Sequence, residues 1–228
     1  MNAARMLVLS AALLAALPAA AQPAGAGSDD AWKFAVTPYV WLPSVDGTVN
    51  VDPSAGGGGA SAGDFKREAA LMVAGEARNG PWAIVADVVF LDLARDTASV
   101  EGLVAQAAVS RALSPSFAVL GGVRYFGVEA SVDTPSGNRS RKEELVDAIV
   151  GVRGRVALRD DPWFFQYHLD AGAGSSALTW QVLAGIGYSF KWGDALLAFR
   201  HLSYDQKDDK PIQSLEFSGP ALGVRFAF

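Results

Sequence analysis

The stretch LTWQVLAGIGYSFK, residues 178–191, decides the fold because its side chains alternate between two kinds. One set is wholly apolar and consists of Trp180, Val182, Ala184, Ile186, Tyr188 and Phe190. The intervening positions include Thr179, Gln181, Gly185, Gly187 and Ser189. Successive side chains of a β-strand point to opposite faces. The stretch is therefore predicted to be a strand with one apolar face and one polar face.

The same alternation recurs along the chain from Trp32 to the end. It is clear in 143–158, 163–173 and 214–228 and blurred in other segments. We predict ten strands, with eight or twelve as the alternatives. They are 32–42, 65–78, 82–92, 98–113, 117–127, 143–158, 163–173, 178–191, 195–204 and 214–228.

The connections between these strands differ in length in a regular way. Every second one is tight: 79–81, 114–116, 159–162 and 192–194. The longer polar ones are 43–64, 128–142 and 205–213, whereas 93–97 and 174–177 are short. Tight turns at one end and longer loops at the other are typical of outer-membrane barrels, whose periplasmic turns are short. An even number of strands places both termini at the turn end.

The apolar faces are predicted to point outward into lipid. They are bulkier and more aromatic than a barrel of this size could enclose, and the polar faces carry few, nearly balanced charges. We therefore expect Val150, Val182 and Ile186 to face lipid, and Gln181 to face the lumen. The inward charges form a predicted set of Glu76, Asp87, Asp147 and Asp170 with Arg124, Arg153, Arg155, Arg200 and Arg225.

Because an unpaired buried charge costs several kcal/mol, these charges are expected to form ion pairs that fill the barrel. A narrow polar path for small solutes is the alternative. Barrels of eight to ten strands are usually filled by side chains, and open channels occur in larger ones.

The aromatic residues fall into two groups along the strands. Trp32, Trp82, Phe117, Trp163, Trp192 and Phe228 lie beside the tight turns, whereas Tyr39, Trp41, Phe90, Tyr125, Trp180 and Tyr204 lie near the loops. The groups are about nine residues apart, which spans about 23 Å on tilted strands. This separation predicts two aromatic girdles at the membrane interfaces.

The N-terminus has the pattern of a cleaved secretory signal. Arg5 precedes an apolar run from Met6 to Leu17, and residues 19–21 (AAA) offer a cleavage site. We predict a signal peptide over 1–21, a flexible leader over 22–31 and a barrel over 32–228. Removing the signal leaves 18 Lys and Arg against 24 Asp and Glu, a net charge of −6, which argues against a nucleic-acid partner. The sequence predicts no disulfide, since it has no cysteine, and no metal or cofactor.

The last eight residues (ALGVRFAF, 221–228) resemble the C-terminal signal that the outer-membrane barrel assembly machinery reads. Gly223, Phe226 and Phe228 match that signal, and Ala221 replaces its usual polar residue. The mature chain also resembles a broad set of proteobacterial outer-membrane barrels, which share an opening like TPYVWLPSVDG (37–47) and a close like SGPALGVRFAF (218–228). The resemblance implies outer-membrane lipid, lipopolysaccharide and the assembly machinery as partners, and it carries no catalytic residues.

Two polar groups could carry chemistry. His201 and Ser203 share a strand face, and Glu216 on the next strand could orient the imidazole so that it activates the hydroxyl. This resembles the lipid-facing triad of outer-membrane lipid A deacylases; an interfacial polar cluster is the other interpretation. His168 and Asp170 invite comparison with outer-membrane proteases, but the sequence offers no matching further acids at the mouth.

Overall fold

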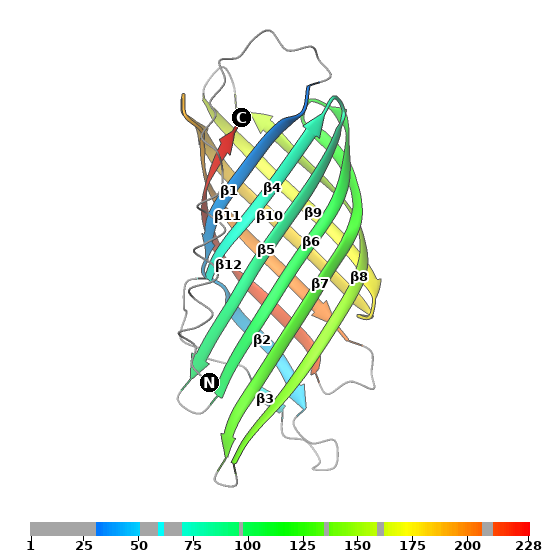
Figure 1. Cartoon of the computed structure of the whole chain (residues 1–228), viewed down its shortest axis with the longest axis vertical. Coiled ribbons are helices and arrows are strands. Elements are labelled where there is room, and N and C mark those ends of the chain that lie inside the picture. The colour runs from blue at the N-terminus through cyan, green and yellow to red at the C-terminus, as the bar shows by residue number, and fades with distance from the viewer. Residues whose placement is uncertain are drawn as a thin grey trace.

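The protein forms a closed antiparallel β-barrel (Figure 1), whose wall has ten strand positions. The computed structural model describes residues 31–50, 59–61, 70–95, 98–134, 137–158, 162–206 and 212–228. The predicted signal peptide and nearly all of the leader lie outside the described residues. From β4 to β12 each strand pairs with the next in sequence, and β1 pairs with both β4 and β12, which closes the barrel. The predicted fold class is confirmed.

Twelve strand segments in the described part of the chain fill the ten positions. They are β1 (Lys33–Trp41), β2 (Ser44–Asn50), β3 (Gly59–Ser61), β4 (Ala70–Asn79), β5 (Trp82–Arg95), β6 (Ala98–Ser114), β7 (Phe117–Thr134), β8 (Gly137–Ala157), β9 (Trp163–Gly174), β10 (Leu178–Ser189), β11 (Asp194–Asp205) and β12 (Ile212–Ala227). Both β1 and β2 pair with β12, at successive positions along it. Together they occupy one strand position of the barrel, interrupted at Leu42 and Pro43. Strand β3 pairs with β2.

Backbone hydrogen bonds join the two termini of the barrel at its turn end. The amide of Phe34 donates to the carbonyl of Phe228 at 2.8 Å, and the amide of Phe228 donates back at 2.9 Å. The tight turn between β4 and β5 contains Gly80 with a φ of 54°, a left-handed conformation that glycine adopts without steric cost. Closure pairs the backbone groups of the first and last strands, so neither is left as a free edge.

Two of the predicted loops were wrong in part. Residues 128–142 continue the hairpin of β7 and β8, whose strands run to Thr134 and restart at Gly137. Residues 43–64 contain β2 and β3. The prediction missed these strands because their apolar residues are few and mostly small and lie among charged and polar residues. Backbone pairing with neighbouring strands defines them in the structure.

The outer wall is apolar, as the alternation predicted. Val150 is 70% exposed, Leu222 is 62% exposed and Ile186 is 51% exposed, whereas the alternate side chains on the same strands point inward. Water-soluble monomeric proteins rarely expose this many large aliphatic side chains on one continuous surface. On β8 the apolar wall ends at Val146, and the next outward residue, Glu144, binds Lys142 at 2.6 Å. That hydrogen bond holds the pKa of the Glu144 carboxyl below its usual value.

The predicted turn-side girdle is present on the outer wall. Trp32, Trp82, Phe117, Trp163, Trp192 and Phe228 are all exposed. Several of these rings stack with neighbours, including Trp192 with Phe190 at 5.1 Å between centroids. The loop-side girdle was predicted wrongly for three members. Trp41 and Tyr204 are buried inside the barrel, and Tyr39 points inward to Asp87.

Candidate functional site

The lumen is filled in three tiers, which follow one another along the barrel axis. A polar layer crosses the middle, an inner apolar cluster lies on its loop side, and charged side chains surround a cavity on its turn side. The order is visible on single strands: Arg124 precedes Phe126 on β7, and Arg200 precedes Leu202 on β11. On each strand the apolar residue takes the next inward position toward the loops.

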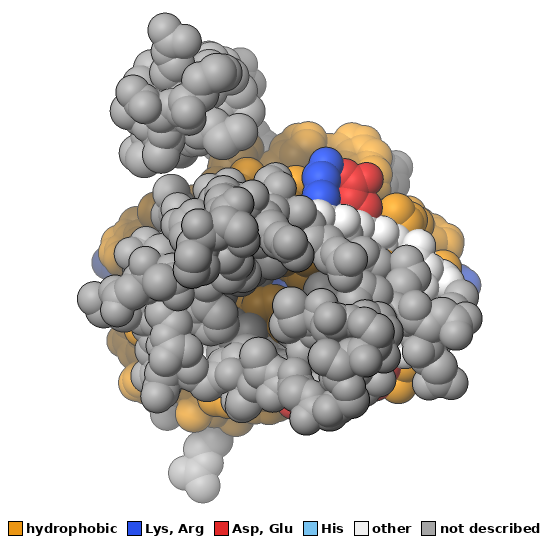
Figure 2. All heavy atoms as spheres, turned by 90° about the horizontal axis from the view of Figure 1, so that it is seen from below, with side chains coloured by type: hydrophobic (Ala, Val, Ile, Leu, Met, Phe, Trp, Pro, Cys, Tyr) orange, Lys and Arg blue, Asp and Glu red, His pale blue; other side chains and the backbone are white. Residues whose placement is uncertain are grey.

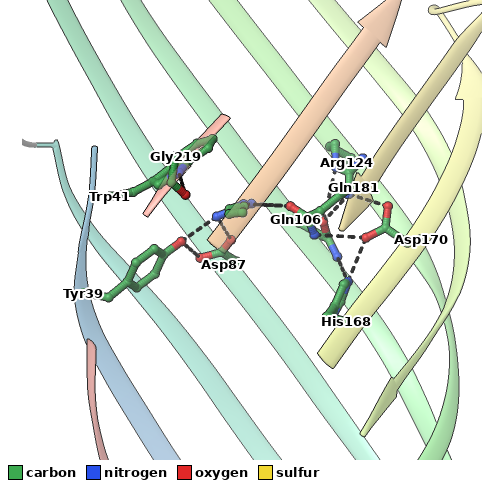
Figure 3. A network of polar contacts seen from close by, with 10 residues as sticks. Tyr39, Trp41, Asp87, Gln106, Arg124, His168, Asp170, Gln181 and Gly219 are labelled. Carbon is green, nitrogen blue, oxygen red and sulfur yellow. Dashed lines mark hydrogen bonds and ion pairs between the residues drawn. The ribbon is translucent and has the colours of Figure 1, made fainter. Parts of the chain in front are cut away.

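The polar layer comprises Tyr39, Asp87, Gln106, Arg124, His168, Asp170, Thr179, Gln181 and Arg200. Figure 3 shows most of the layer and labels Tyr39, Asp87, Gln106, Arg124, His168, Asp170 and Gln181. Its first centre is Arg124, whose Nη2 lies 2.5 Å from Oδ1 of Asp170. The same guanidinium donates to Oε1 of Gln106 at 2.7 Å and to the hydroxyl of Thr179 at 3.0 Å. Oδ2 of Asp170 also contacts Nε2 of His168 at 2.7 Å. Neither charge of this pair is left without a partner.

The second centre of the layer is Arg200. Its Nη1 lies 2.9 Å from Oδ2 of Asp87 and donates to the hydroxyl of Tyr39 at 2.7 Å. Its Nε donates to Oε1 of Gln181 at 2.9 Å, and Nε2 of Gln181 donates to Asp170 at 3.1 Å. Gln181 therefore joins the two ion pairs. Strands β1, β5, β6, β7, β9, β10 and β11 are tied together across the bore.

The inner apolar cluster was not predicted. It consists of Trp41, Met72, Val89, Val104, Phe126, Val128, Leu145, Leu202, Tyr204, Phe217 and Ala221. Rings from different walls meet across the lumen: Phe126 lies 4.5 Å from Tyr204 and 6.1 Å from Phe217. Trp41 packs 6.3 Å from Phe217 and 5.0 Å from the Arg200 guanidinium. At the loop end, hydrophobic side chains are visible deep in the opening (Figure 2).

The predicted lumen face of charges, amides and glycines is therefore wrong for the loop half of the barrel. The parity of the strands could have revealed the cluster. Tyr39 and Trp41 alternate with an apolar row that points outward, and Tyr204 lies on the same face of β11 as Arg200. The predicted girdle grouped the aromatic residues by their distance from the turns and did not separate inward from outward strand faces.

All nine of the predicted lumen charges lie at inward positions, but they divide into separate groups. Asp147, at 1% exposure, has no arginine partner among the described residues. Its carboxylate instead accepts from the backbone amide of Ser176 at 2.8 Å and from the Ser176 hydroxyl at 2.7 Å. It thereby fixes the β9–β10 loop at the loop end. No signal in the sequence singled out Ser176.

The remaining charges lie at the turn end. Glu76 contacts Arg153 at 2.5 Å and Arg78 at 3.0 Å. Asp194, from a tight turn, contacts Arg155 at 2.6 Å and Arg225 at 3.6 Å. A cavity of about 170 Å³ lies between these ion pairs and the polar layer, and a second of about 120 Å³ continues to the turns. The two cavities together extend from the turn side to the polar layer.

The predicted lipid-facing triad is not assembled. His201 donates to, or accepts from, the Ser218 hydroxyl through Nδ1 at 2.6 Å rather than bonding Ser203. Nε2 of His201 is buried without a hydrogen-bond partner in the described residues, and its ring packs 4.4 Å from Trp180. Ser203 and Glu216 are directly opposite each other on β11 and β12. This arrangement lacks the serine–imidazole–carboxylate chain that a serine triad requires.

The described residues contain no group of three or more His, Asp or Glu side chains placed to hold a metal ion. No helix in the described part of the chain is long and apolar enough to cross a membrane.

Comparison with known proteins gives structural matches alone. No family model matches the chain, and no curated protein sequence matches it. Among solved structures, Neisserial surface protein A is 12% identical over 86% of this chain and 97% of its own, with a TM-score of 0.40. Ail of Yersinia pestis is 8% identical over 86% and 99%, with a TM-score of 0.43. The outer membrane protein AlkL is 11% identical over 91% and 95%, with a TM-score of 0.47.

Proposed function

We propose that this protein is an exported barrel of a Gram-negative outer membrane whose lumen does not conduct. Its role is then structural or one of interaction, carried by the outer wall and the loop end. The observation that carries the proposal is the polar layer backed by the inner apolar cluster. Proposed partners are outer-membrane lipid, lipopolysaccharide and the barrel assembly machinery.

Three features support the outer membrane as the location. The outer wall is apolar between an aromatic belt at the turns and the polar residues beyond Val146. A closed barrel satisfies its backbone hydrogen bonds between strands, as lipid requires. The predicted signal peptide and the terminal pattern of Gly223, Phe226 and Phe228 supply export and assembly.

Two successive barriers support a sealed lumen. Side chains of Arg124 and Asp170 have no exposed surface, and that of Arg200 is 1% exposed, so water does not reach the centre of the layer. Beyond them a hydrated ion would meet the apolar rings of Trp41, Phe126 and Phe217. Stripping water from an ion costs far more than such a surface returns. A narrow passage for small solutes is the alternative that a conductance measurement separates from this proposal.

The test is conductance in planar bilayers containing the refolded protein. We expect no current steps above the lipid baseline, with insertion verified by heat-modifiable mobility and a porin added afterwards to prove that the membrane can report channels. As a matched variant, Trp41→Ala combined with Phe217→Ala removes two rings of the inner apolar cluster, neither of which belongs to an ion pair. Steady single-channel steps from the unmodified protein would refute the sealed lumen.

A further inference from the structure

The turn-side cavity is surrounded by more guanidinium groups than carboxylates. We call it the vestibule and define it by the charged side chains that meet there. In the described part of the chain these are Arg78, Arg153, Arg155 and Arg225 with Glu76 and Asp194. They leave an excess of two positive charges.

Each carboxylate in the vestibule is shared by two arginines. Glu76 contacts Arg153 through Oε2 and Arg78 through Oε1. Asp194 holds Arg155 through both oxygens, at 2.6 and 3.3 Å, and approaches Arg225 no closer than 3.6 Å. The acids therefore orient the cluster without neutralising it.

The arginines differ in how many of their donors are used. Arg155 also donates to the Ser189 hydroxyl at 2.7 Å, and its guanidinium lies 3.4 Å from the centre of the Phe164 ring, so it is fixed. Arg153 donates through Nη2 to Glu76. The Arg225 side chain makes no hydrogen bond to any described residue, although a guanidinium carries five N–H donors. Its side chain is 33% exposed, which leaves it accessible from the vestibule.

The shape of the vestibule suits a small ligand arriving from the turn side. Its outer part has a volume of about 120 Å³ and is lined by turn residues Pro81 and Ser116 and by Ser110, an inward hydroxyl. Gln166 continues the lining into the deeper cavity, which ends at the polar layer. A ligand can enter and leave at the turn end without crossing the barrel.

We propose that the vestibule binds a phosphate-type oxyanion, with Arg225 and Arg153 as its main contacts. The planar fork of a guanidinium matches two oxygens of such an anion, and charge-assisted hydrogen bonds are the strong ones. Phosphate is available at that end either as a free anion or as the headgroup of a lipid in the adjoining leaflet. The site is independent of the sealed lumen, since it lies on the turn side of the polar layer.

The experiment titrates refolded protein in an uncharged detergent with inorganic phosphate, at constant ionic strength set with chloride. Binding is measured by broadening of the phosphorus NMR signal and by the midpoint temperature of thermal unfolding. We expect saturable broadening and a rising midpoint for the natural chain. Arg225→Gln should weaken affinity by roughly tenfold, the value of one charge-assisted contact, and Arg225→Lys by less. Arg111→Gln is the matched control, because Arg111 lies on the outer wall over Trp82.

Equal affinity in Arg225→Gln and Arg111→Gln would overturn the proposal. So would the absence of saturable broadening with the natural chain, a result that does not depend on whether any variant folds. A second titration uses short-chain phosphatidic acid in the same detergent. Competition between it and inorganic phosphate assigns the headgroup as a ligand, whereas binding of inorganic phosphate alone assigns the free anion.

Discussion

Nη2 of Arg124 on β7 lies 2.5 Å from Oδ1 of Asp170 on β9, and neither side chain has any surface exposed to solvent. Strand β8 lies between these two strands, so the pair bridges a neighbour across the curved wall. A buried charge of this kind is tolerated when every partner is present. Gln106, Thr179, Gln181 and His168 supply the remaining contacts. The barrel is thus held together by its interior as well as by its backbone.

Replacing Arg124 by methionine should destabilise the folded barrel by about 3–5 kcal/mol, because it leaves Asp170 buried without its main partner. Urea unfolding of refolded protein measures the change. The double variant Arg124→Met with Asp170→Asn should lose less free energy of unfolding than the sum of the losses in the two single variants, since the two residues are coupled. Arg111→Met on the outer wall is the control, with an expected cost below about 1 kcal/mol. A cost for Arg124→Met no larger than that of the control would contradict the polar layer's role.

Val150→Arg should destabilise the barrel by about 2–4 kcal/mol, because Val150 faces lipid near the middle of the apolar wall. Ala74→Arg is the matched substitution on the inner face, where the new side chain enters the cavity opposite Asp87. Ala74→Arg should lower the free energy of unfolding clearly less than Val150→Arg does. The comparison uses the same unfolding assay, and the reverse order of the two costs would show that the faces are assigned wrongly. Gln181 is unsuitable as the inner control because it bridges the two ion pairs.

Phe228→Ala should impair insertion in cells more than folding in detergent. The backbone of Phe228 pairs with Phe34, and these bonds survive the substitution, while its exposed ring is the feature that the assembly signal presents. Surface labelling of cells and heat-modifiable mobility of refolded protein measure the two effects. Normal surface levels of the variant would show that the ring carries no assembly information.

The strands and their faces could be predicted because apolar alternation is a local property of the chain. Residues 178–191 reveal which side of β10 points outward without any knowledge of its neighbours. The interior could not be predicted to the same depth. Which arginine meets which carboxylate depends on the stagger between strands: Arg124 is directly opposite Asp147 in the β7–β8 register, yet its ion pair is with Asp170.

The inner apolar cluster shows a second limit. An inward apolar residue such as Phe126 breaks the alternation and resembles noise in an otherwise regular strand. Its meaning emerges when the strands close and bring it to Tyr204 and Phe217 from the other side of the barrel. The turns were easier, since Gly80 is the residue that a left-handed turn position requires.

In the proposed outer-membrane location, the apolar wall faces lipid around a sealed interior. The chain has no cysteine, so single cysteines at Val150, Leu222 and Ala74 accept a nitroxide label without background. Spin-label accessibility in liposomes then compares collisions with oxygen, which concentrates in lipid, and with a water-soluble nickel chelate. We expect high oxygen and low nickel accessibility at Val150 and Leu222, and lower oxygen accessibility at Ala74. High nickel accessibility at Val150 and Leu222 would contradict it.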